Sequence, residues 1–247
     1  MNNGVIIGFI FLILIIVVLS IGIFVLYREV IDLRAQINTA PSIPLEIEAD
    51  DIVNLDLNLH HGTLNIEKGE SFSIQNTNNQ PIRTSVQGNT FVLDTGRRMM
   101  NRNNNIILTF PRDIVFENVK ISIGGGILEI NHLTADTMHL SVGGGKINAR
   151  DVTAQKLSLE SGAGEINLTG NVSETLDINQ GVGQTSVVLD GKENDFNYKI
   201  NYAVGRVRIG EREYSGISGS DNINNNADKN MTINSSVGNL NVQFHND

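Results

Sequence analysis

The sequence predicts an all-β protein, a β-solenoid of stacked rungs behind one N-terminal transmembrane helix. A glycine returns every 19 residues from Gly126 to Gly183, and apolar residues alternate with polar ones on both sides of each glycine. Alternation of this kind is typical of strands that bury one face. Because so short a unit cannot bury its apolar face alone, successive units are expected to stack. An uncharged apolar run near the N-terminus predicts the helix.

Each unit, or rung, carries its apolar residues at fixed distances from a marker glycine. They stand seven and five residues before the glycine and two and four residues after it. Seven rungs share this register, and their marker glycines are Gly62, Gly126, Gly145, Gly164, Gly183, Gly205 and Gly238. The last two intervals are 22 and 33 residues long, and we interpret their extra residues as loop insertions in an unbroken stack. The longer insertion, residues 213–230, has the Gly, Ser, Asn and Asp content of a loop.

Composition limits the classes of function. The chain of 247 residues has 18 basic and 27 acidic side chains and a net charge of −9, which disfavours a nucleic-acid partner. It contains no cysteine, so disulfides and thiol catalysis are excluded. The lack of cysteine fits an exported bacterial protein.

A membrane anchor is predicted over residues 5–26, which begin with Val5, end with Leu26 and follow a short tail at 1–4. The run carries no charge, and a helix of this length, at ~1.5 Å per residue, spans a hydrocarbon core of ~30 Å. The alternative is a cleaved signal peptide, but the run is long and lacks a basic start and a small-residue cleavage site. The chain is therefore expected in the cell membrane as a single-pass protein. Arg28 and Arg34 follow the span and favour a cytoplasmic solenoid by the positive-inside rule.

The residues after the span predict a short helix and a spacer. Leu26, Val30, Leu33 and Ile37 form one apolar stripe, which indicates a juxtamembrane amphipathic helix over 27–38. A small coiled coil that promotes self-association is the alternative. Residues 39–44 contain two prolines and are expected to end the helix as a stiff linker.

The solenoid is assigned to residues 45–247, and its first part is the less regular one. Four short alternations, over 52–59, 72–74, 90–93 and 106–110, predict strands between Asn-rich turns. Gly62 and Gly126 are 64 residues apart, so further windings or hairpins are expected between Ile66 and Val119.

Three stretches carry a family resemblance. They are the alternating run at 55–66, the strand followed by proline at 106–111, and repeated units such as 157–166. Together they resemble the bacterial adhesin-like family of unknown function with β-strand repeats of the DUF4097 type, over about residues 45–244. The resemblance implies a β-solenoid of the bacterial envelope, sometimes beside stress-response or membrane-sensing components. It implies no established catalytic residues.

No stretch predicts a catalytic, cofactor or metal site. The run 143–146 has the glycines and lysine of a phosphate loop, but Ile147 stands where Ser or Thr would hold magnesium. Leu128 and Ile147 also replace the aspartates that calcium-binding repeats place after such turns. His60 and His61 are adjacent, so on a strand they point to opposite faces and chelate poorly. His132 and His139 are expected to be ordinary surface histidines.

Two polar features remain. The position four residues before the marker glycine and the position three after it are rich in asparagine, which predicts hydrogen-bonded ladders between rungs. A flat polar binding face is the alternative. Residues 97–102 place three arginines around two methionines, which suits either a solvated loop or an anionic lipid surface.

The sequence therefore indicates a non-enzymatic, membrane-anchored envelope protein whose solenoid serves binding, adhesion or sensing. An envelope-stress regulator acting on a membrane partner and a polymerising scaffold are the alternatives. The family resemblance, against the two arginines, favours an extracellular solenoid. Only five residues follow the last rung, residues 231–242, so this rung is expected to be an open edge. Either the loop at 213–230 covers it or a second molecule does, and we expect a site for self-association or a protein partner.

Overall fold

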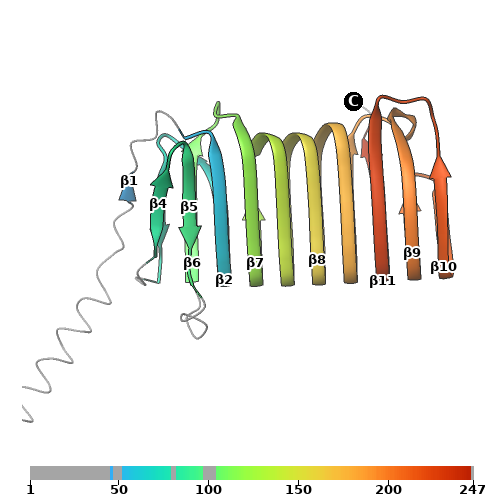
Figure 1. Cartoon of the computed structure of the whole chain (residues 1–247), viewed down its shortest axis with the longest axis horizontal. Coiled ribbons are helices and arrows are strands. Elements are labelled where there is room, and N and C mark those ends of the chain that lie inside the picture. The colour runs from blue at the N-terminus through green and yellow to red at the C-terminus, as the bar shows by residue number, and fades with distance from the viewer. Residues whose placement is uncertain (1–44, 47–51, 79–81, 97–103, 246–247) are drawn as a thin grey trace, which may run out of the picture. The chain divides into compact units, whose positions relative to one another are not determined.

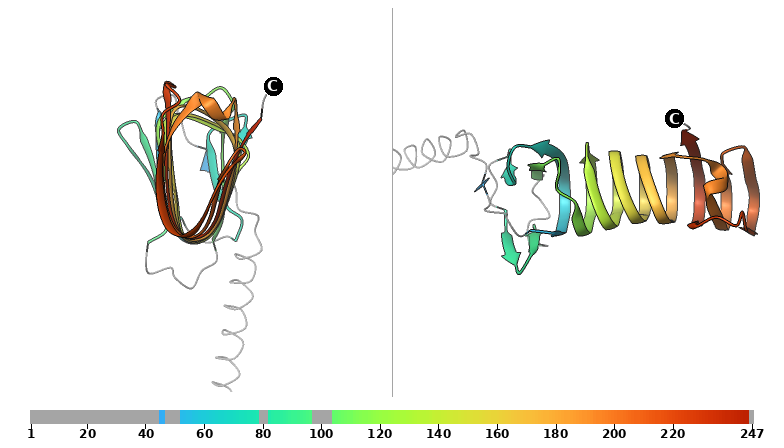
Figure 2. Two further views of the ribbon diagram at one scale, coloured as in Figure 1. Left: turned by 90° about the vertical axis from the view of Figure 1, so that its right-hand side faces the viewer. Right: turned by 90° about the horizontal axis from the view of Figure 1, so that it is seen from above.

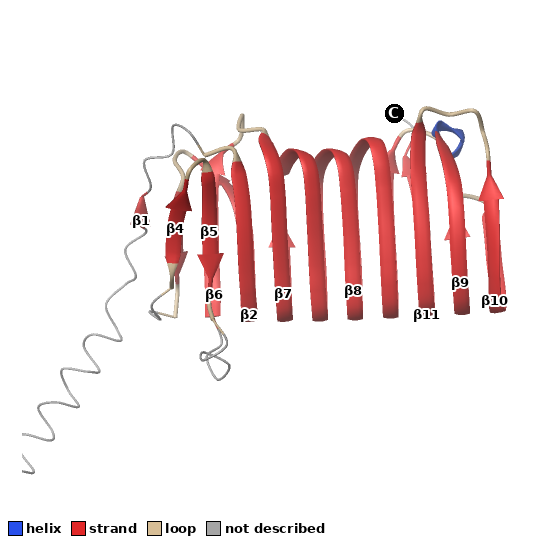
Figure 3. Cartoon of the chain, in the orientation of Figure 1, coloured by secondary structure: helices blue, strands red, loops and turns tan. Residues whose placement is uncertain are grey.

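The computed structural model describes residues 45–46, 52–78, 82–96 and 104–245. They belong to one compact unit, Ser42–Asp247. Within these ranges the chain is almost entirely strand, with one short 3-10 turn, η2 (Glu193–Asp195) (Figure 3). The predicted all-β class is confirmed.

The marker glycines set the register of a stack of parallel rungs. The rungs are formed by β2 (Asn54–Gly69), β7 (Phe116–Ile130), β8 (Leu133–Asp190), β9 (Phe196–Ile209) and β11 (Lys229–His245). Gly62 pairs with Gly126, and Gly126 pairs with Gly145. Viewed along the stack, the strands bend near their middle, at the lower end of Figure 2 (left). The predicted register of the seven rungs is confirmed.

The apolar positions of successive rungs form one core between the two arms of the bend. Leu140, Ile147, Leu159 and Ile166, from adjacent rungs, are all fully buried as predicted. Strand alternation sends their neighbours outward, so Ser141 and Asn148 are partly exposed. The core thus continues from rung to rung between the two arms.

The bend requires glycine at the marker position for two reasons. Gly126 and Gly145 have φ values of 134° and 139°, a region that L side chains rarely adopt. In addition, a Cβ at Gly145 would overlap the carbonyl oxygen of Gly126 in the neighbouring rung. The recurring glycine therefore marks a close approach of two backbones.

The first part of the domain folds around the other side of β2, not between Gly62 and Gly126. Leu55 of β2 pairs directly with Val119 of β7, which corrects the expectation of extra windings between these rungs. Five strands extend the sheet beyond β2: β1 (Leu45–Glu46), β3 (Ser73–Asn76), β4 (Thr84–Gln87), β5 (Thr90–Asp94) and β6 (Asn104–Pro111). β5 and β6 each pair in parallel with one arm of β2. β4 pairs antiparallel with β5, and β3 pairs antiparallel with β6. One hairpin, β4–β5, is thus present, and together with β3 and β6 it covers the N-terminal end of the stack.

At the opposite end the stack departs from chain order. β11 lies between the last coil of β8 and β9, and pairs in parallel with both (Figure 1). Gly238 consequently faces Gly183 on one side and Gly205 on the other. The prediction of a sequential stack is wrong here. The connection around η2 places β9 one strand position beyond the neighbour of β8, and the C-terminal strand β11 fills the position between them.

A strand rather than a loop ends the stack. The expected loop 213–230 contains β10 (Arg212–Ile223), which runs antiparallel along β9. None of its residues is buried, so it covers the last core layer without starting another. The rung at 231–242 is therefore not an open edge, and the expectation that it is one is wrong. The composition of β10 resembles that of a loop because a strand at the end of the stack needs no alternating core face.

Several predicted features lie outside the described residues: the tail, the span at 5–26, the helix at 27–38, the linker at 39–44 and the arginine-rich run at 97–102. Among the residues that the structure describes, no helix is both long and apolar enough to cross a membrane.

Candidate binding surface along the glycine bend

Two asparagine ladders run along the stack, as the repeated positions predicted. Asn234 donates to Asn179 and Asn201 donates to Asn234, both at 2.9 Å between Nδ2 and Oδ1. A second ladder links Asn167 to Asn148 at 3.1 Å and continues to Glu129. Because these amides bond to one another across rungs, their first role is to hold the rungs in register.

A shallow groove of about 540 Å³ crosses four rungs just before the bend. Its outward side chains come from one repeated position: Ser141, Glu160, Asn179 and Asn234. Gly143, Gly162 and Gly181 form the adjacent row, and a Cβ at Gly162 would lie 2.6 Å from the carbonyl oxygen of Gly143. The close backbone contact leaves these three positions without side chains and hollows the surface, and Ser236 takes the same position in the fourth rung.

Polar side chains lie inside the bend beneath the groove, and sequence reasoning missed them. Ser161, Gln180, Thr185 and Ser235 are all buried. Gln180 Nε2 donates to the carbonyl oxygen of Gly183 at 3.1 Å, whereas the Oγ of Ser161, the Oε1 of Gln180 and the Oγ1 of Thr185 have no hydrogen-bond partner. Thr185 occupies a position that is Leu, Ile or Val in the other rungs, and this is the signal that could have found the cluster.

On its outer side the bend carries an apolar row. Val182 pairs with Val237, Val237 with Val204, and Val204 with Ile217 of β10. Their exposed fractions are 53%, 41%, 52% and 88% in the order Val182, Val237, Val204, Ile217. The sequence analysis missed this row, although Val182, Val204 and Val237 each stand directly before a marker glycine, and this shared position is the signal that could have found it.

The lysine of the phosphate-loop candidate is paired with a carboxylate. Lys146, the lysine of the phosphate-loop candidate, lies 3.0 Å from a carboxylate oxygen of Glu165. A hydrogen bond from Asn167, with the contact to Lys146, holds the pKa of the Glu165 carboxyl below its ordinary value. Lys146 therefore pairs with a carboxylate of the neighbouring rung in place of a phosphate.

His60 and His61 are adjacent on β2, whereas His132 directly precedes β8 and His139 lies within it. The ring of His132 is held between Asp151, at 2.7 Å, and the carbonyl oxygen of Arg112, at 3.2 Å. His139 lies 3.8 Å from Glu160, and His60 lies 3.9 Å from Asp94. Across the described ranges no three His, Cys, Asp or Glu side chains come together as a metal site would need.

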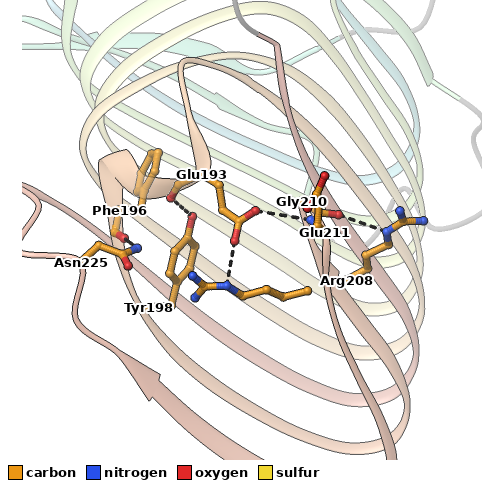
Figure 4. Close-up of polar contacts among 8 residues, drawn as sticks. Glu193, Phe196, Tyr198, Arg208, Gly210, Glu211 and Asn225 are labelled. Carbon is orange, nitrogen blue, oxygen red and sulfur yellow. Dashed lines mark hydrogen bonds and ion pairs between the residues drawn. The ribbon is translucent and has the colours of Figure 1, made fainter.

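A polar cluster around Glu193 joins the two connections at the end of the stack (Figure 4). The Tyr198 hydroxyl donates to the backbone carbonyl oxygen of Glu193, and the Glu193 carboxylate lies 2.9 Å from Arg212 Nε. Burial raises the pKa of the Tyr198 hydroxyl, so it stays a donor at neutral pH. The side-chain amide of Asn225 donates to the backbone carbonyl oxygen of Phe196 at 2.6 Å and holds the loop before β11 in place. These contacts hold the connection around η2, which passes over the position that β11 occupies.

Comparison with known proteins identifies the family of the chain. The family model described as Toastrack DUF4097 matches residues 36–188. A solved structure described as a putative cell adhesion protein from Clostridium sporogenes is 17% identical, with a TM-score of 0.43, and covers 83% of this chain and 100% of that one. A putative adhesin from Bacteroides fragilis is 14% identical, with a TM-score of 0.36, and covers 83% and 98%. No curated protein matches the chain. The family match, which extends over more than half of the sequence, shows that the chain belongs to the Toastrack DUF4097 family.

Proposed function

We propose that the chain is a non-enzymatic binding protein of the bacterial cell envelope, anchored by one helix over residues 5–26, with its β-solenoid outside the membrane. The uncharged apolar run supports the anchor. Family membership supports the envelope and the absence of catalysis. The solenoid serves adhesion or the sensing of envelope material.

The groove before the bend is the observation that carries the binding role. Its side chains Ser141, Glu160, Asn179 and Asn234 repeat once per rung, and neighbouring strands lie about 4.8 Å apart. A row of donors and acceptors at constant spacing suits an extended polymer with a repeating polar backbone. The ends of the stack favour binding over end-to-end polymerisation, because antiparallel strands with charged residues, such as Arg212 and Glu213 of β10, close it.

Topology and binding can be tested on the full chain. A reporter that is active only outside the cytoplasm, fused after Asp247, is expected to be active, and a silent reporter would place the solenoid inside and favour the stress-regulator alternative. For binding, the purified full chain is sedimented with cell-wall sacculi. Glu160→Arg and Asn179→Arg are expected to lower the bound fraction, whereas Glu174→Arg, an exposed change outside the groove, leaves it unchanged. Equal losses in all three variants, or none, would contradict a groove-directed contact.

A further inference from the structure

The apolar row of Val182, Val237, Val204 and Ile217 has no role in the stack itself. Its side chains point away from the core, and all four are exposed. Each stands next to a marker glycine or, for Ile217, next to Gly216. Since glycine adds no side chain, the four aliphatic groups protrude beyond the surrounding bend. An aligned row of this kind on four adjacent rungs indicates a contact surface.

The surroundings of the row are almost free of charge. Within two residues of the glycines at 183, 238, 205 and 216 there is no carboxylate, and the one charged side chain is Arg206. Arg206 lies 3.1 Å from Glu213, at the border of the row. In a chain with a net charge of −9, this is a surface from which acidic groups are missing. It is compatible with an anionic partner.

The row is too narrow for a stable protein interface. It is one side chain wide and four rungs long, whereas a specific interface buries about 800 Å² on each partner. It also contains only aliphatic residues, while the centres of protein interfaces are enriched in tyrosine, tryptophan and arginine. A second copy of the chain therefore fits it poorly.

We propose that this row is a lipid contact, through which the C-terminal half of the stack lies against a phospholipid bilayer. The backbone groups of the bend are already paired between rungs, so only apolar side chains enter the bilayer surface. The inference rests on the proposed function, because a span at 5–26 keeps the domain near the membrane and makes a weak contact sufficient. The row then orients the solenoid on the bilayer surface.

The chain has no cysteine, so single labels can be placed without changing any native residue elsewhere. The full chain, reconstituted into vesicles of phosphatidylcholine and phosphatidylglycerol, is labelled with an environment-sensitive fluorophore at Val204→Cys or Ile217→Cys. The control is Ser173→Cys, an exposed position ten residues before its marker glycine and far from the bend. A nitroxide on the lipid acyl chain is expected to quench the labels at 204 and 217, whose emission shifts to the blue. The label at 173 is expected to show neither effect.

A second variant separates the row from the anchor. In this variant the label is at Val182→Cys, and the exposed residues Val204 and Ile217 are both changed to serine (Val204→Ser and Ile217→Ser). Quenching of the label is expected to be abolished, while the chain still floats with the vesicles. Flotation without quenching at 204 and 217 would overturn the lipid contact alone. Failure to float would contradict both the anchor and the contact. Energy transfer between labels that rises with the protein-to-lipid ratio, without quenching by the nitroxide, would assign the row to a second copy instead.

Discussion

Asn234 donates a hydrogen bond of 2.9 Å to Asn179, which stands 55 residues earlier in the chain. The bond crosses from the C-terminal strand to the last coil of β8, and the same Asn234 accepts a bond from Asn201 on its other side. The two hydrogen bonds of Asn234 thus show that the C-terminal strand lies inside the stack. The lining of the groove depends on this placement, because it brings Asn234 next to Asn179.

The ladder through Asn234 is expected to contribute measurably to stability. Asn234→Leu removes two amide hydrogen bonds, and a net loss of about 1 kcal/mol in the free energy of unfolding is expected, since each exposed bond contributes modestly. Asn58→Leu is the matched control, because Asn58 holds the same exposed position in the rung of Gly62. Chemical denaturation of the two variants compares them, and an equal loss in both would mean that the ladder does not stabilise the stack.

The inward and outward positions of a rung are expected to differ sharply. Leu159 is fully buried, so Leu159→Asp places an unpaired carboxylate in the core and is expected to lower the free energy of unfolding by about 3–5 kcal/mol. Ser141→Asp faces the groove and is expected to change it by about 0.5 kcal/mol or less. Thermal melting of the two variants tests the register, and similar losses would contradict it.

The polar cluster inside the bend predicts a stabilising substitution. Thr185→Val keeps the shape of a buried side chain and removes a hydroxyl that has no partner, so a gain of about 1 kcal/mol is expected. The same change at Thr153, which is exposed, serves as the control and is expected to have little effect. A loss of stability in Thr185→Val would show that the hydroxyl makes a bond in solution.

Alkaline pH is expected to weaken the end of the stack through Tyr198. Burial raises the pKa of this hydroxyl above its ordinary value of 10.0. Below that pH both states are protonated; above it the unfolded chain loses the proton first, so stability falls as pH rises toward the folded pKa. Tyr198→Phe loses the hydrogen bond to Glu193 but is expected to show a smaller drop in stability from about pH 9 to about pH 11. Parallel slopes for the variant and the unchanged chain would contradict the role of Tyr198.

The sequence could predict each rung but not the order in which rungs are stacked. Leu57, Ile121 and Ile233 occupy the same place in their rungs and bury the same kind of side chain, so any rung fits beside any other. The choice of neighbours depends on the connections, and the step around Glu193 has no signal of its own in the apolar pattern. Accordingly the fold, the ladders and the alignment of Val182, Val204 and Val237 were predictable, while the place of Val237 between the other two was not.

The capping strand β10 shows a second limit of such patterns. Residues such as Tyr214 and Ile223 lie toward the core, yet none in the strand is buried. Alternation is strong only where a strand separates core from solvent, and a strand at the end of a stack has too little core to impose it. Its composition therefore resembles that of a loop.

The order of the rungs can be read directly by engineered disulfides in the full chain, whose native sequence has no cysteine. Cysteines are placed in pairs at Val182 and Val237, at Val237 and Val204, and at Val182 and Val204. A disulfide requires Cα atoms within about 7 Å, which adjacent strands satisfy and strands two rungs apart do not. After mild oxidation, the first two pairs are expected to cross-link on a non-reducing gel and the third is not. Cross-linking of 182 with 204, without cross-linking of 182 with 237, would restore a sequential stack and contradict the inserted C-terminal strand, and with it the groove that Asn179 and Asn234 line together.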